Sequence, residues 1–346
     1  MYARVRDILQ RNYLDLLGIP PSGTLKDVRR AIQRAEMEAE MGASTVDAGV
    51  IEAARAALSS DERLLEYRIL ARWRGDERLA RWASPHDGAL EALRSALGGS
   101  PSGAVTAVSA WIAAHRDPSL APALDAPIQQ DGPLWWVGEV AEDYLSAFLI
   151  PGAPTMAAHE LGALDLSPFP AAAERVVMKF IQCRLAEVNE LADLVPEFLG
   201  GDVDQQAAHE ACAYRDEINL LLDDCIVLDG TIERWGLRRT GGKGELFEAF
   251  RELADGLGSV ALRVALYSFA LGDRATGKRL TVKLRSVGMD ADLREAADMV
   301  LARVRQVESL PYRARLFASR VFSEFVGLLI VGGLIAAVSK ACDSGP

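Results

Sequence analysis

The sequence predicts an all-α protein. Apolar residues recur three and four positions apart through most of the 346 residues, which is the spacing of one helix face. The alternation of apolar and polar residues that indicates a half-buried strand is essentially absent. Stretches rich in Gly, Pro and Ser, such as residues 98–103, separate the helical segments. We therefore expect an N-terminal three-helix bundle, a multi-helix domain and a C-terminal apolar helix.

The first helix of the bundle is expected to end near Leu17. Tyr13, Leu16 and Leu17 lie three and four positions apart on one face, and Gly18 followed by Pro20 stops the helix. This short helix can brace the two longer helices that follow, which can pack antiparallel.

The second helix of the bundle is predicted to begin after Thr24, because Thr24 and Asp27 form an approximate capping box. Its apolar face continues at helical spacing through Leu25, Val28, Ile32 and Ala35. A turn signal at residues 42–45 precedes the third apolar stripe, formed by Val50, Ala53, Ala54, Ala57 and Leu58 and ended by Ser59, Ser60 and Asp61.

These landmarks resemble the J-domain family. The family pattern runs Tyr-x-x-Leu-Gly-Ile, then Ser/Thr-Leu-x-x-Val/Ile-x-x-Ala, then Ala-x-x-x-Leu-Ser with a Tyr about two helical turns on. The chain follows this order at Tyr13 to Ile19, with one additional residue, at Thr24 to Ala31, and at Ala54 to Tyr67. The resemblance covers about a sixth of the chain and implies a module that docks DnaK-type chaperones. An ordinary three-helix bundle unrelated to the family is the alternative.

One part of the J-domain pattern is missing. The His-Pro-Asp turn, which in the family stimulates ATP hydrolysis by the chaperone, falls on Glu40, Met41 and Gly42. The resemblance therefore implies a binding scaffold, similar to the J-like domains of plastid and cyanobacterial division proteins and of other membrane-tethered adaptors. The family meets its partner through the basic face of the second helix, which implies a docking surface at Lys26, Arg29, Arg30 and Arg34.

An unbroken apolar run lies near the C-terminus, from Phe325 to Val338. A membrane-spanning helix needs about 20 apolar residues, whereas a run of about 10 to 14 is also typical of a buried helix. Arg313, Arg315 and Arg320 precede the run, and by the positive-inside rule they would stay in the cytoplasm. We expect a tail anchor at about residues 321–338, with a buried helix or an oligomer contact as the alternatives.

The composition is that of a folded protein, with 50% hydrophobic and 25% charged residues. The net charge of -11 argues against a nucleic-acid-binding surface over the whole body. The four cysteines have none of the close spacings of metal or redox sites, and the N-terminus lacks an apolar signal segment, so we expect reduced thiols in a cytoplasmic body. The heavy use of Ala, Arg and Gly is typical of a bacterial protein.

Four regions are expected: a J-like domain at 1–75, short helices at 76–155, a helical bundle at 156–310 and a C-terminal helix at 311–346. Prolines at 151, 154, 168 and 170 mark the best domain boundary. Further helices are predicted at 88–97, 104–115, 135–149, 171–194, 205–235, 245–271 and 290–309, with 171–194 and 205–235 as an antiparallel pair.

Several patterns that suggest catalysis or ligand binding fail on closer reading. Residues 272–279 have the phosphate-loop spacing up to Lys278, but Arg279 replaces the hydroxyl residue that holds magnesium. Neither His159 nor His209 has a second histidine at helical spacing, as a zinc protease helix requires. Most carboxylates at 187, 190, 223, 224 and 229 should be solvated. The pair Trp135 and Trp136 suggests either a docking edge or, more in keeping with a helix start, part of the core.

Three function classes remain. The first is a non-enzymatic, membrane-tethered J-like adaptor that binds partner proteins, among them a DnaK-type chaperone, and that has no cofactor, metal or nucleic-acid partner. The second is a soluble or membrane structural assembly protein without a chaperone partner, in which homo-oligomers are possible. The third is an enzyme, which is disfavoured because no acid, base, nucleophile or metal set converges in the sequence.

Overall fold

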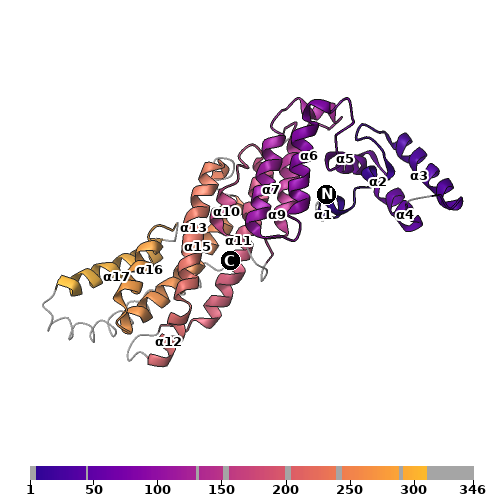
Figure 1. The fold of residues 1–346 in the computed structure, drawn as a ribbon. Helices are drawn as coiled ribbons and strands as arrows, with labels where there is room; N and C mark the ends of the chain where they lie inside the picture. The colour runs from indigo at the N-terminus through magenta and orange to yellow at the C-terminus, as the bar shows by residue number, and fades with distance from the viewer. Residues whose placement is uncertain are drawn as a thin grey trace, which may run out of the picture. The chain divides into compact units, whose positions relative to one another are not determined.

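A computed structural model describes residues 5–43, 46–129, 132–150, 156–198, 204–238, 244–287 and 291–309 of the chain (Figure 1). These residues form helices and no strand; one isolated bridge joins Gln129 and Gly132. The predicted all-α class is therefore confirmed. The chain divides into two compact units, residues 1–156 with 160–176, and residues 157–159 with 177–346. The predicted division into four regions stays a prediction.

The first unit contains the helices up to α9. They are α1 (Val5–Gln10), α2 (Tyr13–Leu17), α3 (Leu25–Glu40), α4 (Ala48–Ala57), α5 (Asp61–Ile69), α6 (Ala80–Ser95), α7 (Pro101–Ala114), α8 (Leu120–Ala123) and α9 (Trp135–Ser146). Two later helices, α10 (Ala158–Gly162) and α11 (Pro170–Leu194), have residues in both units.

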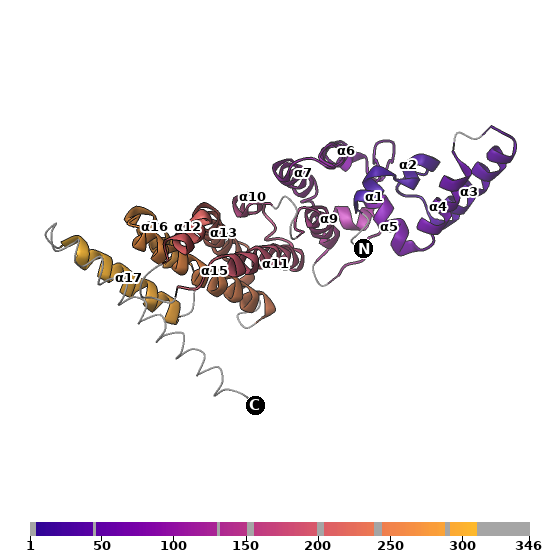
Figure 2. The same ribbon diagram turned by 90° about the horizontal axis from the view of Figure 1, so that it is seen from below.

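Helices α2 to α5 begin and end where local signals place them. Asn12 caps α2 by accepting the N–H of Leu14, and Gly18 ends it in the left-handed region with φ 63°. At the start of α3, the side chains of Thr24 and Asp27 form the predicted capping box. Helix α3 packs against α4, and α2 contacts both α3 and α5. Figures 1 and 2 show α3 and α4 side by side.

The core of the first unit forms where α7 packs against α6 and α9. Its largest fully buried side chains include Trp73, Trp111, Trp136 and Tyr144. Helix α6 begins at Ala80, well before the predicted start at Gly88, and contains Pro85 in its interior. The first part of α6 was not predicted, because Pro85 lies within it and Pro usually ends a helical pattern. Residues 96–100 connect α6 to α7, which pack against each other, and residues 101–103 form the first turn of α7.

The second unit is built around α15 (Glu245–Ala270), which contacts α12 (Gln205–Ala213), α13 (Arg215–Arg234), α16 (Arg274–Leu284) and α17 (Ala291–Ser309). The predicted helix at 205–235 is two helices, because the chain turns at Tyr214 between α12 and α13. Helix α15 is long and apolar enough to cross a membrane, but 67% of its apolar window is buried inside the protein, as in a core helix. The predicted apolar tail at 321–338 lies outside the described residues.

Candidate protein-docking surface

The four predicted docking residues share one exposed face of α3, defined here as the cationic face: Lys26, Arg29, Arg30 and Arg34. Lys26, Arg30 and Arg34 follow each other at one-turn spacing, and Arg29 lies beside them. The opposite side of the helix is buried, through Val28, Ala31, Ile32 and Ala35. Packing of the apolar side therefore fixes the cations toward solvent.

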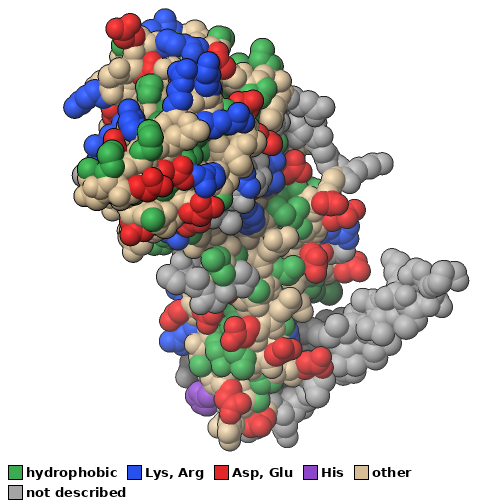
Figure 3. Space-filling view, turned by 90° about the vertical axis from the view of Figure 1, so that its right-hand side faces the viewer, with side chains coloured by type: hydrophobic (Ala, Val, Ile, Leu, Met, Phe, Trp, Pro, Cys, Tyr) green, Lys and Arg blue, Asp and Glu red, His purple; other side chains and the backbone are tan. Residues whose placement is uncertain are grey.

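Few acidic groups neutralise the cationic face. Arg30 lies 3.9 Å from Asp27, and both side chains are exposed. No ion pair joins Lys26, Arg29 or Arg34 to a carboxylate among the residues that the structure describes. Figure 3 views the molecule from the side of α3 and shows several Lys and Arg side chains there. This surface is suited to a partner that carries acidic groups.

The cationic face also carries uncharged exposed residues that the sequence argument left out. Gln33 is exposed between the cations, and Met37 is 57% exposed one turn beyond them. The helical spacing already contained this signal, because Met37 lies three positions after Arg34 and seven after Arg30. An exposed thioether side chain provides an adaptable apolar contact next to the charges.

The structure places Glu40, Met41 and Gly42 at the C-terminal end of α3. Glu40 is its last residue, and Met41 is 73% exposed. Gly42 has φ 67°, and its N–H donates to the Ala39 carbonyl at 3.0 Å. This is a glycine-terminated helix end. None of these three side chains is equivalent to the His or Asp of the family's tripeptide.

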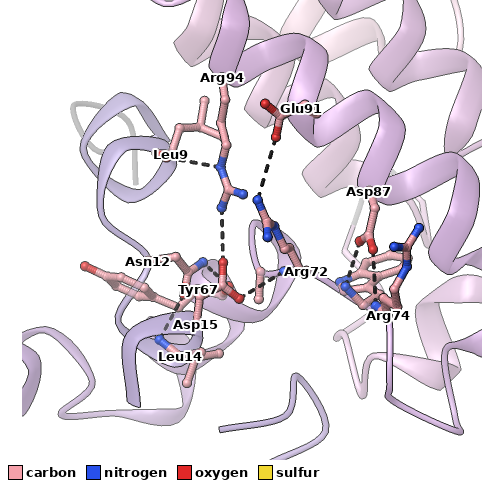
Figure 4. A network of polar contacts seen from close by, with 12 residues as sticks. Leu9, Asn12, Leu14, Asp15, Tyr67, Arg72, Arg74, Asp87, Glu91 and Arg94 are labelled. Atoms are coloured by element: carbon pink, nitrogen blue, oxygen red, sulfur yellow. Dashed lines mark hydrogen bonds and ion pairs between the residues drawn. The ribbon is translucent and has the colours of Figure 1, made fainter. Parts of the chain in front are cut away.

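A network of polar contacts joins α2 and the segment that follows α5 to α6 (Figure 4). Asp15 on α2 accepts the N–H of Arg72 at 3.2 Å and pairs with Arg94 of α6 at 3.2 Å. Arg94 also donates to the Leu9 carbonyl. Asp87 of α6 accepts two backbone N–H groups, at residues 73 and 74. These contacts use α1, α2, α6 and the segment after α5, and leave the cationic face of α3 outside the network.

Asn12 is the buried polar residue at the centre of the α2 attachment. Its side chain caps α2 and donates to the Tyr67 carbonyl at 2.9 Å. Burial raises the pKa of Tyr67 to about 12, so the phenol stays neutral near neutral pH. The Tyr67 ring lies 5.6 Å from that of Tyr13, which adds an aromatic contact between α2 and α5.

Of the carboxylates predicted to be solvated, Glu190 is exposed, but Glu187, Asp223, Asp229 and Asp224 form ion pairs, and Asp224 is buried. It pairs with the buried Arg184 at 2.6 Å and accepts the N–H of Ala158. Arg184 also binds Glu187 at 2.7 Å. Burial raises the pKa of the Asp224 carboxyl, and Arg184 works in the opposite direction. The sequence could not show this pairing, because Arg184 lies forty positions away on another helix.

The remaining candidate motifs have structural roles. Residues 272–279 follow a helix rather than a strand: Gly272 ends α15, and Asp273 caps α16 by accepting the N–H of Thr276. His159 and His209 are exposed, whereas Trp136 is fully buried. No group of three or more metal-binding side chains is found within the described ranges.

Comparisons with protein-family models, with curated proteins and with solved structures gave no match.

Proposed function

We propose that this protein is a non-enzymatic J-like adaptor that binds a partner protein through the cationic face of α3. The observation that carries the proposal is the exposure of Lys26, Arg29, Arg30 and Arg34 on the side of α3 opposite its buried residues. The J-domain resemblance of residues 12–68 points to a DnaK-type chaperone as the partner. The glycine-terminated end of α3 supports docking without ATPase stimulation.

The order of helices α2 to α5 supports the same proposal. A short helix contacts α3 and α5, and α3 packs against α4. The polar network then attaches α2 and the segment after α5 to α6, which holds the module to the rest of its unit. An adaptor needs such an attachment, since a partner bound at α3 must be held in a fixed position relative to any protein that the remaining helices bind.

Charge reversal on α3 tests the docking proposal. The variant Arg29→Glu/Arg30→Glu should fold normally, because both side chains are exposed and Arg30 makes only a long ion pair. We expect its affinity for a purified DnaK-type chaperone to fall at least about tenfold, which corresponds to about 1.4 kcal/mol.

The matched control is Arg294→Glu/Arg305→Glu on α17, where two exposed arginines undergo the same charge change. Its affinity should stay within about twofold of the wild type. Equal losses in both variants would indicate general charge attraction, and no loss in either would exclude the cationic face as the docking surface. Absence of chaperone binding by the wild type would favour an assembly protein without a chaperone.

We further propose that the tail at about 321–338 tethers the adaptor to the cytoplasmic face of a membrane. The uninterrupted apolar run after Arg313, Arg315 and Arg320 supports this topology. After alkaline carbonate extraction, the full-length chain should stay in the membrane pellet and a chain ending at Arg320 should not. If both chains are extracted, the tether is excluded and the docking proposal is unaffected.

A further inference from the structure

Two buried histidines in the first unit form a closed hydrogen-bond chain. His86 on α6 and His115 at the end of α7 have no exposed surface. Nδ1 of His86 lies 2.8 Å from Nε2 of His115. The other nitrogen of His86 lies 2.8 Å from the Ala71 carbonyl, and that of His115 lies 2.7 Å from the Trp111 carbonyl. All four ring nitrogens therefore have a partner at hydrogen-bond distance.

The number of protons on the two histidine rings follows from the carbonyl oxygens that accept their hydrogen bonds. A carbonyl oxygen only accepts hydrogen bonds, so Nε2 of His86 and Nδ1 of His115 must each carry a proton. The contact between Nδ1 of His86 and Nε2 of His115 needs one more proton, because two unprotonated nitrogens would direct their lone pairs at each other. Three protons on two rings make one imidazole and one imidazolium, with a charge of one.

We propose that His86 and His115 are a buried proton-binding site that holds one shared proton near neutral pH and joins α6, α7 and the segment around Ala71. Loss of that proton replaces the ring-to-ring hydrogen bond with lone-pair repulsion. The junction between these three segments is then weakened.

Aromatic rings around the pair offset part of the cost of burying its charge. The Trp73 ring is stacked on His86 with centroids 3.5 Å apart and planes 1° apart. Trp111 lies 4.1 Å from His115, and Trp136 lies 5.2 Å from it. A cation held against an aromatic face is stabilised by the ring quadrupole, most strongly for Trp and away from water.

Charged groups on the surrounding elements are held by other partners, and none forms a hydrogen bond with either ring in the described part of the chain. On α6, Asp87 accepts the N–H groups of residues 73 and 74, and Arg94 binds Asp15 and the Leu9 carbonyl. Arg72 pairs with Glu91, Arg116 pairs with Asp165, and Asp117 accepts from Trp82 and Ser119. On α9, Glu139 and Glu142 pair with Arg175, Asp143 accepts the N–H of Val5, and Tyr144 donates to the Leu93 carbonyl.

Burial opposes a charge on either ring. Loss of hydration lowers the pKa of His115 to about 4, and burial, together with the charges of His115 and Arg94, lowers the pKa of His86. The same burial opposes the first charge, but the hydrogen-bond count outweighs it, since a neutral pair would place two lone pairs 2.8 Å apart. The two rings therefore titrate as one coupled site.

Nitrogen NMR of the full-length chain labelled in histidine tests the proton count. The chain has four histidines, and the exposed His159 and His209 serve as references that His159→Gln and His209→Gln identify. Near neutral pH we expect three of the four buried ring nitrogens to be protonated, with one exchangeable proton correlated to both rings. Two protonated nitrogens, or four, would overturn the proposal.

The pH dependence of stability provides an independent test with a definite sign. In the proposal, the pKa for loss of the shared proton in the folded state lies above the ordinary histidine pKa of about 6.5. The proton then stabilises the fold below about pH 6.5, and this contribution is lost as the pH rises. The difference in denaturation midpoint, wild type minus His115→Gln, should therefore decrease as the pH becomes alkaline. A difference that instead grows more favourable with rising pH would mean that both rings are neutral in the folded state.

Discussion

At the residue scale, Lys26 occupies a position that the helix itself disfavours. Lys26 is in the first turn of α3, directly before Asp27, the partner of the N-cap residue Thr24 in the capping box. The N-terminal end of a helix carries partial positive charge, so a cation there is destabilising by about 0.3–1 kcal/mol. Asp27 offsets part of this cost through its capping box with Thr24. Lys26 therefore contributes to the proposed docking surface at a cost to the stability of α3.

The variant Lys26→Glu separates these two roles. We expect it to increase the free energy of unfolding of the first unit by about 0.3–1 kcal/mol, because an anion suits the first turn of α3. The same variant should weaken chaperone binding. Urea unfolding and titration calorimetry measure the two effects. Tighter or unchanged binding by a more stable Lys26→Glu variant would argue against the cationic face as the docking surface.

Buried polar residues show how each unit specifies its packing. Arg184 and Asp224 pair inside the second unit, while Asn12 links α2 to α5 in the first. Removing one partner of a buried ion pair typically costs about 3–5 kcal/mol, because the remaining charge stays buried without compensation. These residues are therefore structural, although isolated carboxylates in the sequence resemble candidate catalytic groups.

At the element scale, the close approach of α9 to the start of α11 depends on a glycine. A Cβ atom on Gly138 would lie 2.6 Å from Cβ of Phe169 and 3.0 Å from that of Ala172. Gly88 in α6 is also inside a helix, but a Cβ atom there meets nothing within 4 Å. The two positions form a matched pair for testing this packing.

Gly138→Ala should lower the free energy of unfolding by about 1–3 kcal/mol, because the added methyl group overpacks a tight contact. Gly88→Ala should raise it by about 0.5–1 kcal/mol, since Ala loses less conformational entropy in a helix than Gly. Urea denaturation of both variants tests the packing. Stabilisation of similar size in both would show that α9 and the start of α11 are not so close.

Restoring the family tripeptide tests the J-like interpretation of α3. Pro at position 41 removes the N–H that donates to the Met37 carbonyl and disfavours helical geometry at position 40, so α3 should end slightly earlier. Asp at position 42 must adopt φ 67°, which costs about 1 kcal/mol. The buried residues of α3 end at Ala35, so the fold should survive.

We expect the variant Glu40→His/Met41→Pro/Gly42→Asp to gain stimulation of ATP hydrolysis by a DnaK-type chaperone, measured in single turnover. Adding Arg29→Glu/Arg30→Glu should remove that gain. A folded variant that binds the chaperone without any stimulation would mean that α3 and α4 do not present the turn as a J domain does.

Local signals explain which elements could be predicted from the sequence. The capping box at Thr24 and the stop at Gly18 set the ends of α2 and α3, and continuous helical periodicity revealed α15 and α17. Helix α16 was missed, although Asp273 with Thr276 three positions later is a cap signal. Its Gly and Lys residues instead suggested a phosphate loop.

The candidate site was predictable for the same reason, and the histidine pair was not. The cations of α3 lie within one helix, so their common face follows from spacing alone. His86 and His115 are separated by 29 positions and meet only because α6 and α7 pack together. A single histidine in a helical segment carries no local sign of such a partner.

At the scale of the whole molecule, the cationic face contrasts with a chain of net charge -11. A local positive surface on an acidic protein can orient an acidic partner during association, and this attraction weakens as the ionic strength rises. The acidic remainder of the chain would repel the same partner. We therefore expect one preferred contact region, on α3.

Site-specific photo-crosslinking in cells tests this central claim most directly. A photoreactive residue replaces Gln33, which lies among the cations without changing their charge, and a control replaces the exposed Met299 on α17. We predict a covalent adduct with a DnaK-type chaperone from position 33 only, and its loss when Arg29→Glu/Arg30→Glu is added. The same adduct from both positions, or none from position 33, would contradict the account.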